Sequence, residues 1–155
     1  MENINTDYKL LFKNEEKRTT IIKEMEKYLN ERIQSIEYHW KETGEIEKAS
    51  QRFNDYSNNI LQQLQALNND LRKLSELKSD AFKKDVNILL NLESQNYKTT
   101  LGIFINKLQC FELLKKDDDC NLLKKEKEIS MLKGNLASIR EEINDFLTNL
   151  KYKYL

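Results

Sequence analysis

The stretch ISMLKGNLASIREEINDFLTNL, residues 129–150, decides the fold of this chain. Its apolar residues recur at alternating steps of three and four: Ile129, Leu132, Leu136, Ile139, Ile143, Phe146 and Leu150. This spacing places all of them on one stripe of an α-helix, and a stripe that repeats every seven residues is the seam of a coiled coil. The stretch therefore predicts a heptad helix over residues 121–155 that buries one face against at least one other helix.

The rest of the chain has a composition that suits long helices. No proline and only three glycines occur among its 155 residues, so the usual helix breakers are almost absent. Charged residues make up 34% of the chain and hydrophobic residues 39%, a hydrophobic share that argues against simple disorder. We expect an all-α protein, built as an elongated coiled coil or long-helix bundle with antiparallel helical hairpins.

A second seam lies in the middle of the chain. Its members again alternate steps of three and four: Ile60, Leu64, Leu67, Leu71 and Leu74. The pattern then slips, because Lys78 and Asp85 stand where the seam predicts apolar residues. Such a slip indicates either a stutter in one helix or a break near Ser79, whose side chain suits a helix N-cap. We interpret residues 45–115 as one long central helix, continuous or only kinked, with a break near residue 79 as the alternative.

The second half of this central segment carries the widest apolar surface. Its stripe comprises Leu101, Phe104, Leu108 and Phe111, and further apolar residues flank it. An apolar arc that is broader than one stripe needs more than one neighbouring helix to cover it. We therefore predict the thickest part of the core here, and we predict a partner-helix interface from this stripe together with the two seams.

The first segment, residues 1–44, predicts an amphipathic helix with a polar interruption. Apolar residues follow one face from Tyr8 to Trp40, but the stretch 14–20 is polar all round and is expected to be exposed, frayed or covered by a partner. Gly44 is either a turn after the helix or a glycine tolerated inside a longer one. The acidic run at 116–120 predicts a further turn, because adjacent carboxylates repel and aspartate competes with helical hydrogen bonding.

The charge pattern argues against nucleic acid as a partner. Lys and Arg number 26 and Asp and Glu number 26, so the formal net charge is zero, and no concentrated basic face is visible. No stretch approaches the ~18 consecutive apolar residues of a membrane helix, and the first fourteen residues lack the pattern of a signal peptide. We expect a cytoplasmic or nuclear protein that is not secreted, does not insert into a membrane and takes no small-molecule substrate.

Few residues of this sequence are candidates for chemistry. The one histidine, His39, stands beside Trp40, whose place on the apolar stripe favours packing over cation binding. Cys110 and Cys120 are expected to be reduced thiols, the first in the core and the second exposed. The run Asp117–Asp119 lacks the alternate ligand spacing and the glycine of a calcium loop. We therefore predict no catalytic residue, no metal site and no cofactor, and we expect that the chain is not an enzyme.

Helix association is then the function that the sequence favours. We predict a non-enzymatic coiled-coil subunit of a multi-protein complex, a scaffold whose seams pack against other coiled-coil proteins in a hetero-oligomer or a homodimer. In composition the chain resembles small helical subunits of kinetochore, microtubule and cytoskeletal, ciliary-transport and vesicle-tethering complexes. The alternative is a self-contained three- or four-helix bundle, an adaptor that binds a partner helix or peptide in the manner of spectrin-like modules. A break near Ser79 favours this alternative, because it divides the chain into four helices of similar length.

Overall fold

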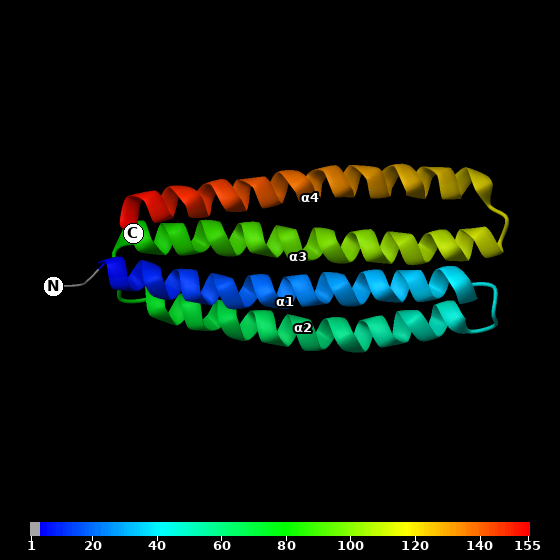
Figure 1. Cartoon of the computed structure of the whole chain (residues 1–155), viewed down its shortest axis with the longest axis horizontal. Coiled ribbons are helices and arrows are strands. Elements are labelled where there is room, and N and C mark those ends of the chain that lie inside the picture. The colour runs from blue at the N-terminus through cyan, green and yellow to red at the C-terminus, as the bar shows by residue number, and fades with distance from the viewer. Residues whose placement is uncertain (1–3) are drawn as a thin grey trace.

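The computed structural model describes residues 4–155, which form four antiparallel α-helices and no strand. The helices are α1 (Ile4–His39), α2 (Glu45–Ser75), α3 (Asp80–Lys115) and α4 (Asp119–Tyr154). They run alternately in opposite directions and lie alongside one another, so the molecule is elongated (Figure 1). The prediction of an all-α bundle with antiparallel hairpins is confirmed. Residues 1–3 of the first predicted helix lie outside the described part of the chain.

The central segment contains a full reversal of the chain between α2 and α3. The interpretation of residues 45–115 as one continuous or kinked helix is therefore wrong, and the alternative break near residue 79 is present. Ser79 has extended backbone, and its hydroxyl accepts a hydrogen bond from the amide of Phe82 at 3.2 Å. This bond caps the first turn of α3, because it satisfies an amide that has no partner within the helix.

The polar residues that interrupt the central seam both bind the beginning of α1. Lys78 Nζ lies 3.2 Å from Asp7 Oδ1, and the hydroxyl of Tyr8 donates a hydrogen bond to Asp85. Burial, together with this hydrogen bond, raises the pKa of Tyr8. Lys78 and Asp85 thus tie α1 to the turn between α2 and α3, so the slip in the apolar pattern marks the end of the bundle and not a stutter.

The other two turns lie close to their predicted places. Gly44 separates α1 from α2 with a φ of 80°, a left-handed conformation that glycine adopts at little cost. The acidic turn is shorter than the predicted range 116–120, because α4 already begins at Asp119. The cause is a cap: the carboxylate of Asp118 accepts a hydrogen bond from the amide of Asn121 at 3.2 Å.

Two apolar clusters form the core, and they draw on different helices. Buried members of the cluster nearer Gly44 come from α1, α2 and α3: Ile22, Met25, Leu29, Ile33, Ile36, Phe53, Ile60, Leu64, Phe104 and Leu108. The cluster at the opposite end also includes a residue of α4: Tyr8, Leu11, Phe12, Leu71, Phe82, Val86, Leu89, Leu90 and Leu150. Among the described residues, α4 thus supplies buried side chains to these clusters only near its C-terminal end.

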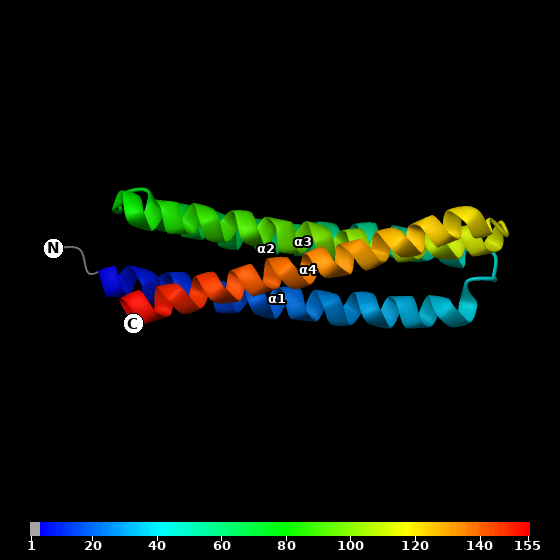
Figure 2. The same cartoon turned by 90° about the horizontal axis from the view of Figure 1, so that it is seen from above.

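The course of α4 explains this difference. In Figure 2, α4 begins over the side formed by α2 and α3 and ends over α1. Near its end, the ring of Tyr154 stacks on the ring of Tyr8 with centroids 3.8 Å apart. Earlier in the helix, Leu132 lies against Gly102 of α3. The first half of α4 therefore packs on α3 and stands away from α1.

Candidate functional site

Charged and polar side chains occupy the interior between the two apolar clusters. We call them the buried polar cluster; its members are Asn14, Glu15, Arg18, Asn68, Glu93 and Asn96. Arg18 is only 1% exposed, less than any other charged residue that the structure describes, and Glu15 and Glu93 are also buried. Since α1, α2 and α3 each contribute to it, the cluster joins three helices at mid-bundle.

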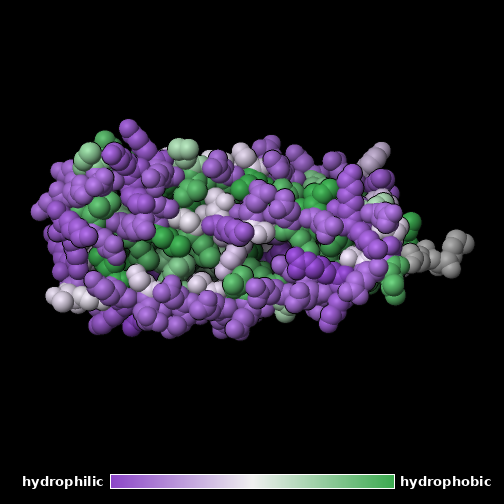
Figure 3. Space-filling view, turned by 180° about the vertical axis from the view of Figure 1, so that it is seen from behind, coloured by the Kyte–Doolittle hydropathy of each residue, from purple (hydrophilic) through white to green (hydrophobic). Residues whose placement is uncertain are grey.

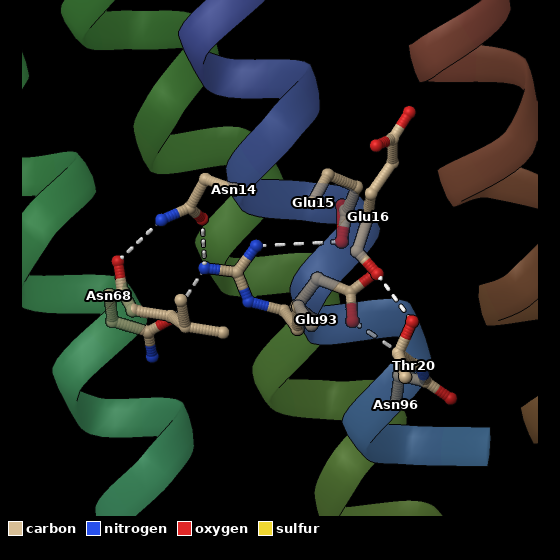
Figure 4. Close-up of polar contacts among 9 residues, drawn as sticks. Asn14, Glu15, Glu16, Thr20, Asn68, Glu93 and Asn96 are labelled. Carbon is tan, nitrogen blue, oxygen red and sulfur yellow. Dashed lines mark hydrogen bonds and ion pairs between the residues drawn. The ribbon is translucent and has the colours of Figure 1, made fainter. Parts of the chain in front are cut away.

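The guanidinium of Arg18 is the centre of this cluster. Its Nη2 donates hydrogen bonds to Asn14 Oδ1 at 2.7 Å and to Asn68 Oδ1 at 2.8 Å, while Nη1 lies 3.4 Å from Glu15 Oε1. In Figure 4, Asn14, Glu15 and Asn68 lie close together, and Glu93 and Asn96 of α3 lie beside them. Within the cluster, Glu15 Oε2 and Arg18 Nε have no hydrogen-bond partner among the described residues. Polar groups of this kind are costly to bury, so the cluster is a place of high electrostatic free energy.

Two carboxyl groups share this interior with one guanidinium. Burial, and then the nearby Glu93 carboxyl, raise the pKa of Glu15 from the ordinary 4.5 to about 8, although Arg18 opposes this shift. Burial likewise raises the pKa of Glu93 against the opposing effect of Arg18. The three side chains are neutral as a set when the two carboxyl groups carry one proton between them. We therefore expect one bound proton in the cluster at neutral pH.

The stretch 14–20 was predicted to be exposed, frayed or covered by a partner. This prediction is wrong for Glu15 and Arg18, which are buried within the chain. Glu15 and Arg18 lie between Leu11 and Ile22 on the buried face of α1. Charged residues are rarely buried, so a polar stretch of this kind predicts exposure to solvent. A positional signal was present, because positions 11, 15, 18 and 22 continue the steps of four and three that define the buried stripe.

Replacing Glu15 by Gln is expected to stabilise the chain in alkaline solution. Folding raises the pKa of Glu15, so the protonated carboxyl group adds to the free energy of unfolding. This contribution is fully present below about pH 4.5 and is lost as the pH rises through about 8. We expect Glu15→Gln to raise the free energy of unfolding by about 1 to 3 kcal/mol at pH 9, and by less at pH 5, because the amide does not ionise. Urea unfolding followed by circular dichroism at both pH values measures this.

The exposed neighbour Glu16 provides the matched control for this substitution. Glu16→Gln is expected to leave the free energy of unfolding nearly unchanged at both pH values. If the stability of the Glu15→Gln chain fell with rising pH as steeply as that of the parent chain, the raised pKa would belong to another group.

A groove runs along the surface between α1 and α4, with α3 as its floor; we call it the α1–α4 groove. Glu26 of α1 and Arg140 of α4 form an ion pair across it. Arg140 Nε also donates to Asn96 Oδ1 at 3.1 Å, and Nη2 donates to Thr100 Oγ1 at 3.4 Å. Arg140 therefore ties the middle of α4 to both α1 and α3.

The Glu26–Arg140 ion pair contributes to the lining of two cavities in this groove. The first, of about 180 Å³, lies nearer Gly44, and its lining includes five apolar side chains together with Lys107 and Lys133. The second, of about 230 Å³, reaches inward to Glu93 and Asn96 of the buried polar cluster. Both cavities thus combine apolar and polar side chains in their linings.

The residues predicted as a partner-helix interface fall into two sets. Buried within the chain are Ile60, Leu64, Leu71, Phe104, Leu108, Ile129, Ile143 and Leu150. Half-buried are Leu67, Leu74, Leu101, Phe111, Leu132, Leu136, Ile139 and Phe146. The central seam and the α3 stripe supply most of the buried set from α2 and α3, whereas most of the α4 seam belongs to the half-buried set.

The side of the molecule formed by α2 and α3 also keeps apolar groups at its surface. Figure 3 shows this side from behind, with apolar side chains gathered in hollows between rows of polar ones. One hollow is a cavity of about 110 Å³ whose lining includes Leu61, Leu64 and Tyr97. It is smaller than either cavity of the α1–α4 groove.

The other candidate residues lie near the ends of the helices or at the surface. His39 Nδ1 lies 2.9 Å from Glu42 Oε1, and this hydrogen bond raises the pKa of the exposed His39. Trp40 packs half-buried against the cluster nearer Gly44. Cys110 is half-buried and Cys120 is exposed, and both are free thiols. The geometry brings none of these four residues to the groove.

Two searches for particular kinds of site give negative results within residues 4–155. In this range no group of three or more His, Cys, Asp or Glu side chains is placed to hold a metal ion. No helix of the same range combines the length and the apolar character that crossing a bilayer requires. Comparison with protein-family models, with curated proteins and with solved structures yields no significant match to this chain.

Proposed function

We propose that this chain is a non-enzymatic helix-assembly module, a self-contained four-helix bundle that binds a helix of a partner protein along α4. The observation that supports this proposal is the uneven burial of helices of equal length. Only Ile129, Ile143 and Leu150 are buried among the 36 residues of α4, whereas α1 and α3, also of 36 residues, each bury eleven. A fourth helix that is covered so sparsely has room for a further neighbour.

The seam of α4 has more apolar side chains than the bundle covers. Leu132, Leu136 and Ile139 are half-buried members of this seam, and the adjacent Met131 is 69% exposed. Full burial of a Leu, Ile or Met side chain contributes about 1.5 to 3 kcal/mol, so covering the remaining surface offers a partner helix a favourable gain. Helix packing along a heptad seam is the mode of binding that this surface fits.

Because the four helices form a closed bundle, we favour an adaptor that binds one partner helix over a subunit of an open coiled coil. The central seam, which could have served partner chains, packs its buried members Ile60, Leu64 and Leu71 against other helices of the same chain. Among the three predicted surfaces, the α4 seam keeps the largest number of half-buried members. The proposal is therefore confined to helix binding at α4; a scaffold role of kinetochore, cytoskeletal, ciliary-transport or vesicle-tethering type would use the same surface.

Photo-crosslinking from α4 tests the proposed function. A photoreactive phenylalanine analogue at Ala137, an exposed position one turn from the groove residue Lys133, is expected to give a discrete product heavier than the chain alone in cells that express the protein, because a bound partner helix would lie against this position. The same analogue at Glu47, an exposed position of α2, is the control and is expected to give no such product. Equal products from both positions, or none from Ala137, would contradict binding along α4.

A further inference from the structure

The first cavity of the α1–α4 groove has a definite shape and lining. Leu29 and Ile33 of α1 and Leu136 of α4 form its sides, and Ile103 and Phe104 come from α3. Its volume of about 180 Å³ is below the ~300 Å³ at which pockets for drug-sized ligands begin, yet it suffices for one or two apolar side chains. Size therefore favours anchor residues of a protein partner over a cofactor.

Two lysine side chains give the same cavity a positive charge. Lys107 of α3 and Lys133 of α4 both line it, and neither forms an ion pair or hydrogen bond with another described residue. Burial, and then the nearby Lys133, lower the pKa of Lys107, while Glu37 of α1 has the opposite effect. The one carboxylate in the cavity lining, Glu26, is engaged by Arg140. The lining of the cavity thus contains more cationic side chains than anionic ones.

We propose that the α1–α4 groove binds an acidic amphipathic helix, whose apolar side chains enter this cavity and whose Glu or Asp pairs with Lys107 and Lys133. The proposal rests on the proposed function and names the chemistry of the partner. A carboxylate between two ammonium groups replaces their repulsion by attraction. Salt screens the half-buried Lys107 less than it screens an exposed charge. Leu136 belongs to the half-buried seam of α4, so a helix in the groove also covers part of that seam.

The hollow on the α2–α3 side lacks this combination. Its lining contains Lys98 and Arg18, but Arg18 is already bound to the buried polar cluster and Glu93 lies in the same lining. Its smaller cavity, of about 110 Å³, also has less room for an apolar anchor. Charge and volume together therefore favour the α1–α4 groove over this hollow.

Two designed peptides test this proposal. Both are amphipathic helices of roughly 18 residues with leucine at i, i+3, i+4 and i+7; one carries glutamate beside the leucines and the other carries lysine there. Fluorescence anisotropy of the labelled peptides is measured against the full chain. We expect the acidic peptide to bind about tenfold more tightly than the basic one, a difference that added salt reduces.

Charge reversal in the groove gives the decisive comparison. The double variant Lys107→Glu with Lys133→Glu is expected to invert the preference between the two peptides, and the milder Lys107→Gln with Lys133→Gln is expected to abolish it. Lys98→Glu with Lys127→Glu, at exposed positions of the same two helices outside the groove, is expected to keep the preference. Circular dichroism of each variant establishes that it is folded.

The possible outcomes separate this proposal from the proposed function. An unchanged preference for the acidic peptide in both groove variants would overturn the groove as its site. If Met131→Glu then weakened the same binding, helix binding along α4 would still stand. Failure of every variant and of the parent chain to bind either peptide would contradict both proposals. Displacement of the acidic peptide by equimolar inorganic phosphate would show a simple anion site and overturn the helix proposal.

Discussion

Replacing Arg18 by Leu is expected to lower the free energy of unfolding by about 3 to 5 kcal/mol at pH 8, because removal of one member of a buried charge set leaves the others uncompensated. The guanidinium binds Asn14, Asn68 and Glu15 at 2.7, 2.8 and 3.4 Å, and it is almost fully enclosed. Without it, two buried carboxyl groups face each other with no cation between them, and two amide oxygens lose their donor.

The loss caused by Arg18→Leu is expected to depend on pH. Arg18 lowers the pKa values of both Glu15 and Glu93, so its removal raises these values further above those of the unfolded chain. A group whose pKa is raised by folding keeps its stability at low pH and loses it as the pH rises, so the destabilisation should be smaller at pH 5 than at pH 8. Urea unfolding at both pH values measures it.

The exposed Lys17, next in sequence to Arg18, supplies the control. Lys17→Leu is expected to change the free energy of unfolding by no more than about 0.5 kcal/mol at either pH. A loss for Arg18→Leu that is the same at pH 5 and pH 8 would mean that Arg18 acts through packing alone, against the electrostatic account of the cluster.

Leu11→Ala is the second substitution with a large expected effect, a loss of about 2 to 5 kcal/mol in the free energy of unfolding. Leu11 is 0% exposed and belongs to the core cluster in which all four helices meet. Truncation there removes buried methyl groups and leaves a cavity that helices held on several sides refill only in part.

The neighbouring Leu10, which is 43% exposed, makes this prediction specific to position. Leu10→Ala removes the same atoms from the adjacent residue and is expected to cost less than about 0.5 kcal/mol. Thermal and urea unfolding of both variants provide the comparison. Equal losses would contradict the orientation of α1 in this bundle, in which Leu11 faces the core and Leu10 faces solvent.

The helices were predictable from the sequence, but the way in which they cover one another was only partly so. Regular spacing from Ile129 to Leu150 predicts a helix with one covered face, and Gly44 indicates a turn for a clear conformational reason. A seam shows that a helix is covered without showing which helix covers it. The seam from Ile60 to Leu74 therefore predicted a partner chain equally well, although its buried members pack within this chain.

The reversal near Ser79 is hard to predict from the sequence for a related reason. Lys78 and Asp85 break the apolar pattern, and a broken pattern alone does not distinguish a stutter from a turn. Their partners, Asp7 and Tyr8, come from the other end of the sequence. Only the packing of α1 against this turn decides between the two, and that is information about long-range contacts.

The buried polar cluster and the Glu26–Arg140 ion pair could not be predicted from the sequence for the same physical reason. Glu15 and Arg18 read as an interruption of the apolar stripe, because their buried partners Asn68 and Glu93 lie on other helices far along the chain. The pairing of Glu26 with Arg140 across the α1–α4 groove is equally long-range. The register of positions 11, 15, 18 and 22 was the one local sign that the polar stretch turns inward.

The buried polar cluster and the sparse burial of α4 have different consequences for motion. Hydrogen bonds between Arg18, Asn14 and Asn68 are made in one alignment of α1 and α2, so the cluster favours a single register of those helices. By contrast, α4 has few buried side chains to lose when it moves away. Local opening is cheapest where the fewest apolar contacts break, so α4 should be the first helix to open.

Hydrogen exchange of the isolated chain, followed by mass spectrometry, tests most directly the central claim that this is a closed bundle whose α4 is left available to a partner. We predict that amides in the first half of α4, around Leu123 to Leu136, exchange faster than amides of α1 around Leu11 to Met25, and that the acidic peptide slows their exchange. Equal protection of α1 and α4 in the isolated chain, with no change on adding the peptide, would contradict the claim.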